Sequence, residues 1–199
     1  MPTTKTASIL KGEETRLLDS WMEQLLAAGA VRSGQIKEAE LRRQTSTFLR
    51  AILDVLQSAA PHDDVGVSAW SEVRGILDDV SQSRAHQGFS PREMAIFVFS
   101  LKAPIFALLR EKIGHDVQQL VAEIMAVDKV LDMLGVYTME MYQKSRDAII
   151  ERQQQELLEL STPVVQLWNK ILALPLIGTL DSNRTQFVME SLMDGIVRT

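Results

Sequence analysis

Apolar residues recur at three- and four-residue spacings from residue 8 to residue 160, and no stretch in this range alternates with period two. This pattern predicts an almost entirely helical segment. The first predicted helix carries an apolar face over residues 17–26 and ends near Gly29. Two more helices are expected at about residues 36–59, ending before Pro61, and at about residues 67–84, with Gly88 as a stop.

The fourth helix has the clearest start signal in the chain. Ser90-Pro91-Arg92-Glu93 combines an N-cap serine, a proline at the first helical position and a glutamate three residues after the serine. Apolar residues then cover nearly every face from Met94 to Leu109, which is typical of a helix at the centre of a bundle. Pro104 is expected to kink this helix.

A heptad pattern begins after His115. Counting Val117 as position a makes positions a and d apolar for three heptads, after which the seam fades. Few helix-breaking residues follow before about Leu160, so we expect one long helix that leaves the bundle. Gly135 is a mild weak point in it, because glycine disfavours helix interiors.

After residue 160 the pattern changes to short apolar runs. Residues 164–168 and 171–177 are separated by the turn-like pair Asn169-Lys170, which predicts a β-hairpin. Asp181-Ser182-Asn183 then provides N-cap residues for a further helix. The last segment is therefore expected to have β-β-α order.

Composition narrows the functional class. The 199 residues are 46% hydrophobic and 24% charged, as in an ordinary soluble globular protein. The net charge of −5, without a Lys/Arg stripe, argues against nucleic-acid binding. The absence of cysteine excludes disulfides, thiolate metal sites and a cysteine nucleophile.

Localisation follows from the apolar segments. The most apolar stretch, residues 94–109, is shorter than the ~20 apolar residues that a membrane span needs, and Lys102 and Pro104 interrupt it. The first eleven residues lack the apolar core of a signal peptide. We therefore expect a cytoplasmic protein that does not enter a membrane.

Two groups of motifs carry a family resemblance. The C-terminal part of the chain, about residues 157–198, resembles the opening of the STAS domain in stressosome RsbR-type co-antagonists. The motifs that carry this resemblance are Leu160-Ser161-Thr162-Pro163, Pro175-Leu176-Ile177-Gly178-Thr179 and the segments around Met189 and Gly195. The N-terminal part is similar to the helical sensor domain of the same family at three places: Leu18-Asp19-Ser20-Trp21, residues 35–41 and residues 84–93. Together these resemblances touch most of the chain.

The resemblance implies a non-enzymatic scaffold and sensor protein. Members of the family dimerise through a globin-like helical domain and pass a long helix into the STAS core. They assemble with RsbS-type partners into a large cytoplasmic particle that sequesters an RsbT-type serine/threonine kinase. Stress leads the kinase to phosphorylate the STAS domains and to leave.

The resemblance also points to a phosphorylation site. Ser182 occupies the position where the family usually has its first phospho-acceptor threonine, and Thr179 is the second candidate. A predicted helix N-terminus at Ser182 would favour an added phosphate, while Asp181 would oppose it by charge repulsion. The alternative role of Ser182 is a simple N-cap hydroxyl. The second acceptor of the family would lie beyond Thr199.

Histidine is the obvious residue type for a cofactor. In a globin-like fold the haem-ligating histidine lies on the helix before the last two, and His86 is suitably placed for that role, whereas a surface or turn histidine is the simpler interpretation. Family members often carry a globin fold without haem, so no cofactor and no metal site is favoured. A haem-based gas sensor and a plain helical dimerisation module remain alternatives to the scaffold.

These observations predict a mainly α protein with three parts. Residues 8–115 are expected to form a globin-like sensor domain and residues 116–160 a long dimer and linker helix. Residues 161–199 are expected to form the first part of an α/β STAS domain. This last part is far shorter than a typical domain of about 100 residues, so we expect an incomplete one.

Overall fold

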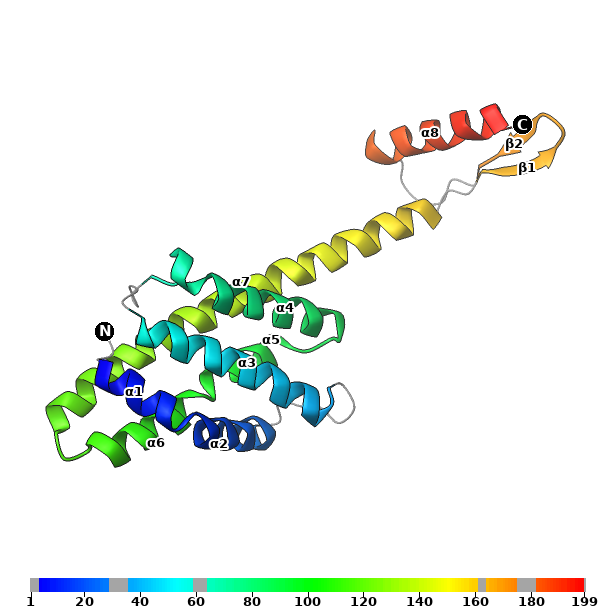
Figure 1. Ribbon diagram of the computed structural model, residues 1–199. Helices are drawn as coiled ribbons and strands as arrows, with labels where there is room; N and C mark the ends of the chain where they lie inside the picture. The colour runs from blue at the N-terminus through cyan, green and yellow to red at the C-terminus, as the bar shows by residue number, and fades with distance from the viewer. Residues whose placement is uncertain (1–3, 29–35, 59–63, 161–163, 175–181, 199) are drawn as a thin grey trace. The chain divides into compact units, whose positions relative to one another are not determined.

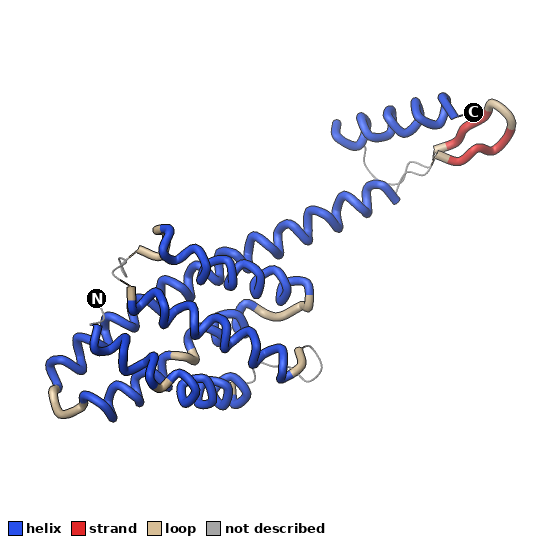
Figure 2. Tube along the Cα trace, in the orientation of Figure 1, coloured by secondary structure: helices blue, strands red, loops and turns tan. Residues whose placement is uncertain are grey.

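The computed structural model describes residues 4–28, 36–58, 64–160, 164–174 and 182–198. The chain divides into two compact units, residues 1–146 and 147–199. Nearly all of the described residues are helical, and the strands form one short hairpin (Figures 1 and 2). No helix among the described residues combines the length and the apolar character that crossing a membrane requires.

The first unit is a helical bundle, as the 3.6-residue periodicity predicts. The first predicted helix is preceded by a further short helix, from which Glu13 separates it. The elements are α1 (Thr4–Gly12), α2 (Glu14–Ala27), α3 (Glu38–Gln57), the short 3-10 helix η1 (Ser68–Trp70), α4 (Ser71–His86), α5 (Pro91–Phe99), α6 (Lys102–Ile113) and the long helix α7 (Val117–Leu160).

The expected single helix over residues 94–109 is wrong. Helix α5 ends at Phe99 and α6 begins at Lys102, so the chain breaks before Pro104 instead of kinking at it. Proline has no N–H to donate to the carbonyl four residues earlier, that of Ser100, and the hydrogen-bond ladder ends there. Pro104 then lies in the first turn of α6, where an N–H would have no intrahelical partner in any case.

The predicted start of α5 is confirmed. The Ser90 hydroxyl accepts a hydrogen bond from the Glu93 backbone N–H at 3.3 Å, and the Glu93 carboxylate accepts one from the Ser90 backbone N–H at 2.7 Å. This reciprocal capping box satisfies two backbone donors at the helix end.

Three aromatic side chains from different helices form the centre of the bundle. Trp21 of α2, Phe48 of α3 and Phe97 of α5 pack with ring centroids 5.4–6.0 Å apart and tilted planes. All three are fully buried. The Trp21 indole N–H donates to the Ser100 hydroxyl at 2.9 Å, so the break between α5 and α6 supplies the polar partner that a buried tryptophan needs.

Helix α7 packs one face on the bundle up to Tyr142. Four of the buried side chains, Val127, Leu131, Leu134 and Thr138, belong to the predicted heptad seam, and the others widen the packed face beyond it. Within that seam Leu131 and Leu134 are buried, whereas Val117 is 67% exposed. The buried face comprises Glu123, Val127, Val130, Leu131, Leu134, Thr138 and Tyr142.

Helix α7 is joined to α4 and to the segment after it by three hydrogen bonds. The Tyr137 hydroxyl donates to the Asp78 carboxylate at 2.9 Å, and the Ser81 hydroxyl donates to the Thr138 carbonyl at 3.4 Å. The Tyr142 hydroxyl donates to the carbonyl of Phe89. These bonds fix the position of α7 against α4.

Gly135 serves close packing and is not a weak point of α7. It is buried, and a Cβ atom at this position would overlap the ring of Phe99 at the end of α5. The same ring lies 5.1 Å from the Lys102 ammonium, which pairs with Asp128 and Asp132 of α7 at 2.7 and 2.6 Å. The glycine therefore allows the α5–α6 junction to approach α7.

The second unit confirms the predicted β-β-α order. Strands β1 (Val165–Trp168) and β2 (Ile171–Ala173) pair antiparallel, with Val165 opposite Ala173. Lys170 adopts φ 65°, the left-handed conformation that a tight hairpin turn requires. Helix α8 (Ser182–Arg198) packs beside β2, and Gly195 lies against Val164 and Leu172. The part of the expected second strand after Leu174 lies outside the described residues.

We expect Gly135→Ala to lower the free energy of unfolding by about 1–3 kcal/mol, because the new methyl group displaces the Phe99 ring. Urea denaturation measures the change. Gly75→Ala is the matched control: Gly75 is an exposed interior residue of α4 whose Cβ would meet nothing within 4 Å, so stability should rise by roughly 0.5–1 kcal/mol. Equal effects at the two positions would contradict the packing role of Gly135.

Candidate functional site

Ser182 is the first residue of α8, and it is exposed. The first turn of this helix contains no acidic residue, so no carboxylate there opposes an added phosphate. The backbone N–H groups at the start of a helix are in general suited to phosphate oxygens. Asp181 and the second candidate, Thr179, lie outside the described residues.

His86 is the last residue of α4 and is exposed. Its Nδ1 lies 2.9 Å from the Gln82 carbonyl oxygen, so the ring is bound to its own helix. It is therefore separate from the buried aromatic cluster of the bundle. The described residues contain no group of three or more histidine, aspartate or glutamate side chains with the geometry to hold a metal ion.

The most unusual side chain of the first unit is Arg84, which the sequence analysis did not single out. It is only 1% exposed, although arginine is almost never fully buried without a paired charge. Its guanidinium lies over the ring of Phe97 at 4.3 Å and near that of Phe89 at 5.3 Å. The sequence does indicate that Arg84 is buried. Val73, Leu77 and Val80 form the inward face of α4, and a further step of four residues along this face reaches Arg84.

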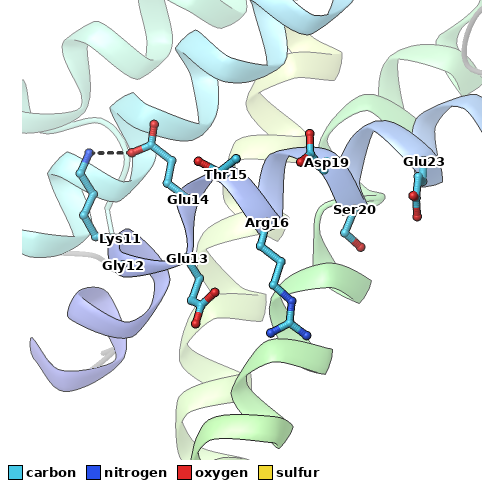
Figure 3. Close-up of a pocket in the computed structure, with 9 residues that line it drawn as sticks. All are labelled: Lys11, Gly12, Glu13, Glu14, Thr15, Arg16, Asp19, Ser20 and Glu23. Carbon is cyan, nitrogen blue, oxygen red and sulfur yellow. Dashed lines mark ion pairs between the residues drawn. The ribbon is translucent and has the colours of Figure 1, made fainter.

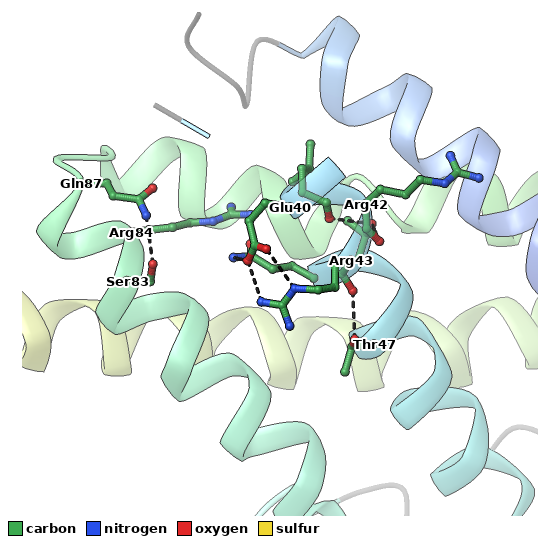
Figure 4. Close-up of polar contacts among 10 residues, drawn as sticks. Glu40, Arg42, Arg43, Thr47, Ser83, Arg84 and Gln87 are labelled. Atoms are coloured by element: carbon green, nitrogen blue, oxygen red, sulfur yellow. Dashed lines mark hydrogen bonds and ion pairs between the residues drawn. The ribbon is translucent and has the colours of Figure 1, made fainter. Parts of the chain in front are cut away.

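Arg84 has few hydrogen-bond partners. Its Nη2 donates to the Gln44 side-chain oxygen of α3 at 3.3 Å, while Nε and Nη1 have no partner among the described residues. Figure 4 shows the side chain extending from α4 toward α3. Burial lowers the pKa of Arg84 to about 10, and the negative charge of Glu93 opposes this shift. The group therefore stays charged at neutral pH.

A polar network on α3 adjoins this guanidinium. The Gln44 amide donates to Glu40 at 2.9 Å, and the Arg43 guanidinium donates to both oxygens of Glu40 at 2.9 and 2.7 Å. The hydrogen bonds from Arg43 lower the pKa of Glu40. The network thus joins Arg43 to Glu40 directly and Arg84 to Glu40 through the Gln44 amide, while the charge of Glu93 also acts on Arg84.

A groove of about 220 Å³ runs between α3 and α4 beside this network. Gln44 and Ser83 line it, so the groove lies directly over the neighbours of Arg84. Glu40, Arg43 and Asp79 supply charge, and Ile76 and Val80 supply apolar surface. The groove thus has a small apolar surface, formed by Ile76 and Val80, and the buried cation Arg84 lies behind its lining residues Gln44 and Ser83.

A larger depression of about 740 Å³ lies at the α1–α2 junction and is lined by charged side chains (Figure 3). The cations there are paired with acids of other helices. Lys11 contacts Asp54 of α3 at 2.9 Å, and Arg16 contacts Glu111 of α6 at 2.6 Å. These exposed ion pairs join helices, and each contributes little to stability on its own.

Comparison with known proteins identifies two relationships. A family model described as the N-terminal domain of the RsbT co-antagonist protein rsbRD matches residues 15–157, which run from α2 to near the end of α7. The RsbT co-antagonist protein RsbRA of Bacillus subtilis (strain 168) is 23% identical over 186 residues, or 93% of this chain. The chain spans 63% of the length of that relative.

We expect Arg84→Met to change the free energy of unfolding by no more than about 1 kcal/mol, because methionine keeps the buried stem while removing a charge that lacks a close carboxylate. Arg84→Ala should lose about 2–5 kcal/mol, because it leaves a cavity beneath Phe97. Thermal and urea denaturation of both variants measure the difference. Equal losses would show that the charge itself stabilises the fold.

Proposed function

The chain belongs to the family of RsbT co-antagonist rsbRD N-terminal domains, and on this premise we propose that it is a non-enzymatic scaffold and sensor protein in stress signalling. The observation that carries the proposal is the family match, which covers α2 to α6 and most of α7. The name of this relative, a co-antagonist, describes a protein that acts with others against RsbT. We extend that role to this chain.

The proposed roles of the three parts of the chain follow the family pattern. Residues 8–115 act as a globin-like sensor domain, residues 116–160 as a dimer and linker helix, and residues 161–199 as the opening of a STAS domain. The chain forms a cytoplasmic assembly with RsbS-type partners and sequesters an RsbT-type kinase. The mainly helical first unit and the β-β-α order of the second unit are compatible with this division.

An apolar surface on α6 and α7 supports the proposed homodimer. A groove of about 410 Å³ between these helices is lined by Phe106, Leu120 and Ile124 together with two alanines and one charged residue, Arg110. Val117 and Met125 are each 67% exposed on the same segment of α7. A second copy of this surface would remove these side chains from water.

Phosphorylation at Ser182 is the proposed regulatory event, with Thr179 as the second candidate. A signal received by the helical unit would shift α7, because hydrogen bonds couple Tyr137 and Thr138 of this helix to α4, and Tyr142 to Phe89 in the segment after α4. A displaced α7 would change the access of the kinase to the start of α8.

Mixing the chain with an RsbS-type partner and an RsbT-type kinase tests the scaffold. We expect a particle far heavier than a dimer by light scattering, and Ser182→Ala should remove most of the phosphate label. Ser191→Ala, a change at a serine inside α8, should keep the label. A free dimer in the mixture would overturn the scaffold, whereas label that persists on Ser182→Ala would overturn the site alone.

Insertion of a short glycine run at Gln154 should uncouple stress from Ser182 phosphorylation, because it interrupts α7 between Tyr142, its last buried residue, and Leu160 at its end. Phosphorylation measured in cells with and without stress should then become equal. Gln154→Ala keeps the helix intact and should preserve the difference. A stress response that survives the glycine insertion would contradict transmission through α7.

A further inference from the structure

We propose that the groove between α3 and α4 binds a small monocarboxylate whose two oxygens pair with the guanidinium of Arg84. This guanidinium is 1% exposed, and two of its three nitrogens have no hydrogen-bond partner among the described residues. A buried cation normally has a paired charge and satisfied N–H groups. The proposal does not depend on the assignment of Ser182 or on assembly with a kinase.

The charges around the groove favour a ligand with a single negative charge. Arg84 and Arg43 carry two positive charges, and Glu40 neutralises one of them through its two hydrogen bonds with Arg43. The charge of Glu93 also acts on Arg84, but the only hydrogen-bond partner of its guanidinium among the described residues is the neutral Gln44, so a ligand carboxylate would make its first direct charged contact. Asp79 lies exposed at the groove and would repel a second negative charge.

The geometry of the guanidinium N–H donors favours a carboxylate as the ligand. The N–H groups along one edge of a guanidinium match the two oxygens of a planar carboxylate in a bidentate pair. The apolar floor formed by Ile76 and Val80 suits a short hydrocarbon tail. With about 220 Å³, the groove is smaller than the ~300–1,000 Å³ of sites for drug-sized molecules, so a tail of a few carbons fits best.

Gln44 separates the groove from Arg84 and must move aside when the ligand binds. It is half-buried, it lines the groove, and its side-chain oxygen occupies a position 3.3 Å from Nη2, where a carboxylate oxygen would bind. A ligand would displace this neutral acceptor and replace it with a charged one, which forms the stronger hydrogen bond. The contact between Arg84 and Phe97 need not change.

Titration of the whole chain with sodium propionate, followed by ¹H–¹⁵N NMR, tests the proposal. We expect saturable shifts at the amides of Gln44, Ser83 and Arg84. Propionamide, the neutral analogue, and sulfate, a dianion, should each bind at least tenfold more weakly. Shifts that do not saturate, or equal binding of propionamide, would overturn the proposal.

Variants assign the effect to the groove. Arg84→Met and Gln44→Glu should each weaken propionate binding at least tenfold, the first by removing the cation and the second by placing an internal carboxylate beside it. Gln44→Ala should tighten binding several-fold, because it removes the resident acceptor. Arg42→Met, which changes an arginine of α3 that pairs with Asp19, should leave binding unchanged. Unaltered binding by Arg84→Met, or loss of binding by Arg42→Met, would contradict the assignment.

Discussion

The break between α5 and α6, just before Pro104, determines which helices the surrounding side chains contact. Because the hydrogen-bond ladder ends at Ser100, α5 and α6 are separate helices, and the junction between them makes contacts in several directions. Ser100 receives the hydrogen bond of Trp21, Phe99 fits against Gly135, and Lys102 pairs with two aspartates of α7. A continuous helix would not direct these neighbouring side chains to α2 and α7 together.

Polar groups inside the bundle serve two different purposes. The Trp21 indole and the Tyr142 hydroxyl have hydrogen-bond acceptors, and these contacts fix helices relative to one another. Arg84 differs, because its charge is held by the faces of two aromatic rings and by one amide oxygen. This incomplete pairing is the physical reason to look for function beside α3 and α4, since functional sites are where proteins tolerate such imbalances.

The sequence predicts the helices well because their signals are local. The capping box at Ser90 and Glu93, the 3.6-residue periodicity and the hairpin at Asn169-Lys170 all depend on neighbouring residues. The break before Pro104 was misplaced because the start of α6 depends on contacts with α7 as well as on the proline. Gly135 was misread for the same reason: its role depends on Phe99, which is distant in the sequence.

The hydrogen bonds from α7 to α4 and to Phe89 after it hold the long helix at one place along its length. Tyr137, Thr138 and Tyr142 lie within five residues, or about 7.5 Å of helix, so together they resist sliding and axial rotation at this point. The following 18 residues, up to Leu160, extend about 27 Å from this fulcrum. For a straight helix of that length, a tilt of about 5° would displace the far end by roughly 2 Å.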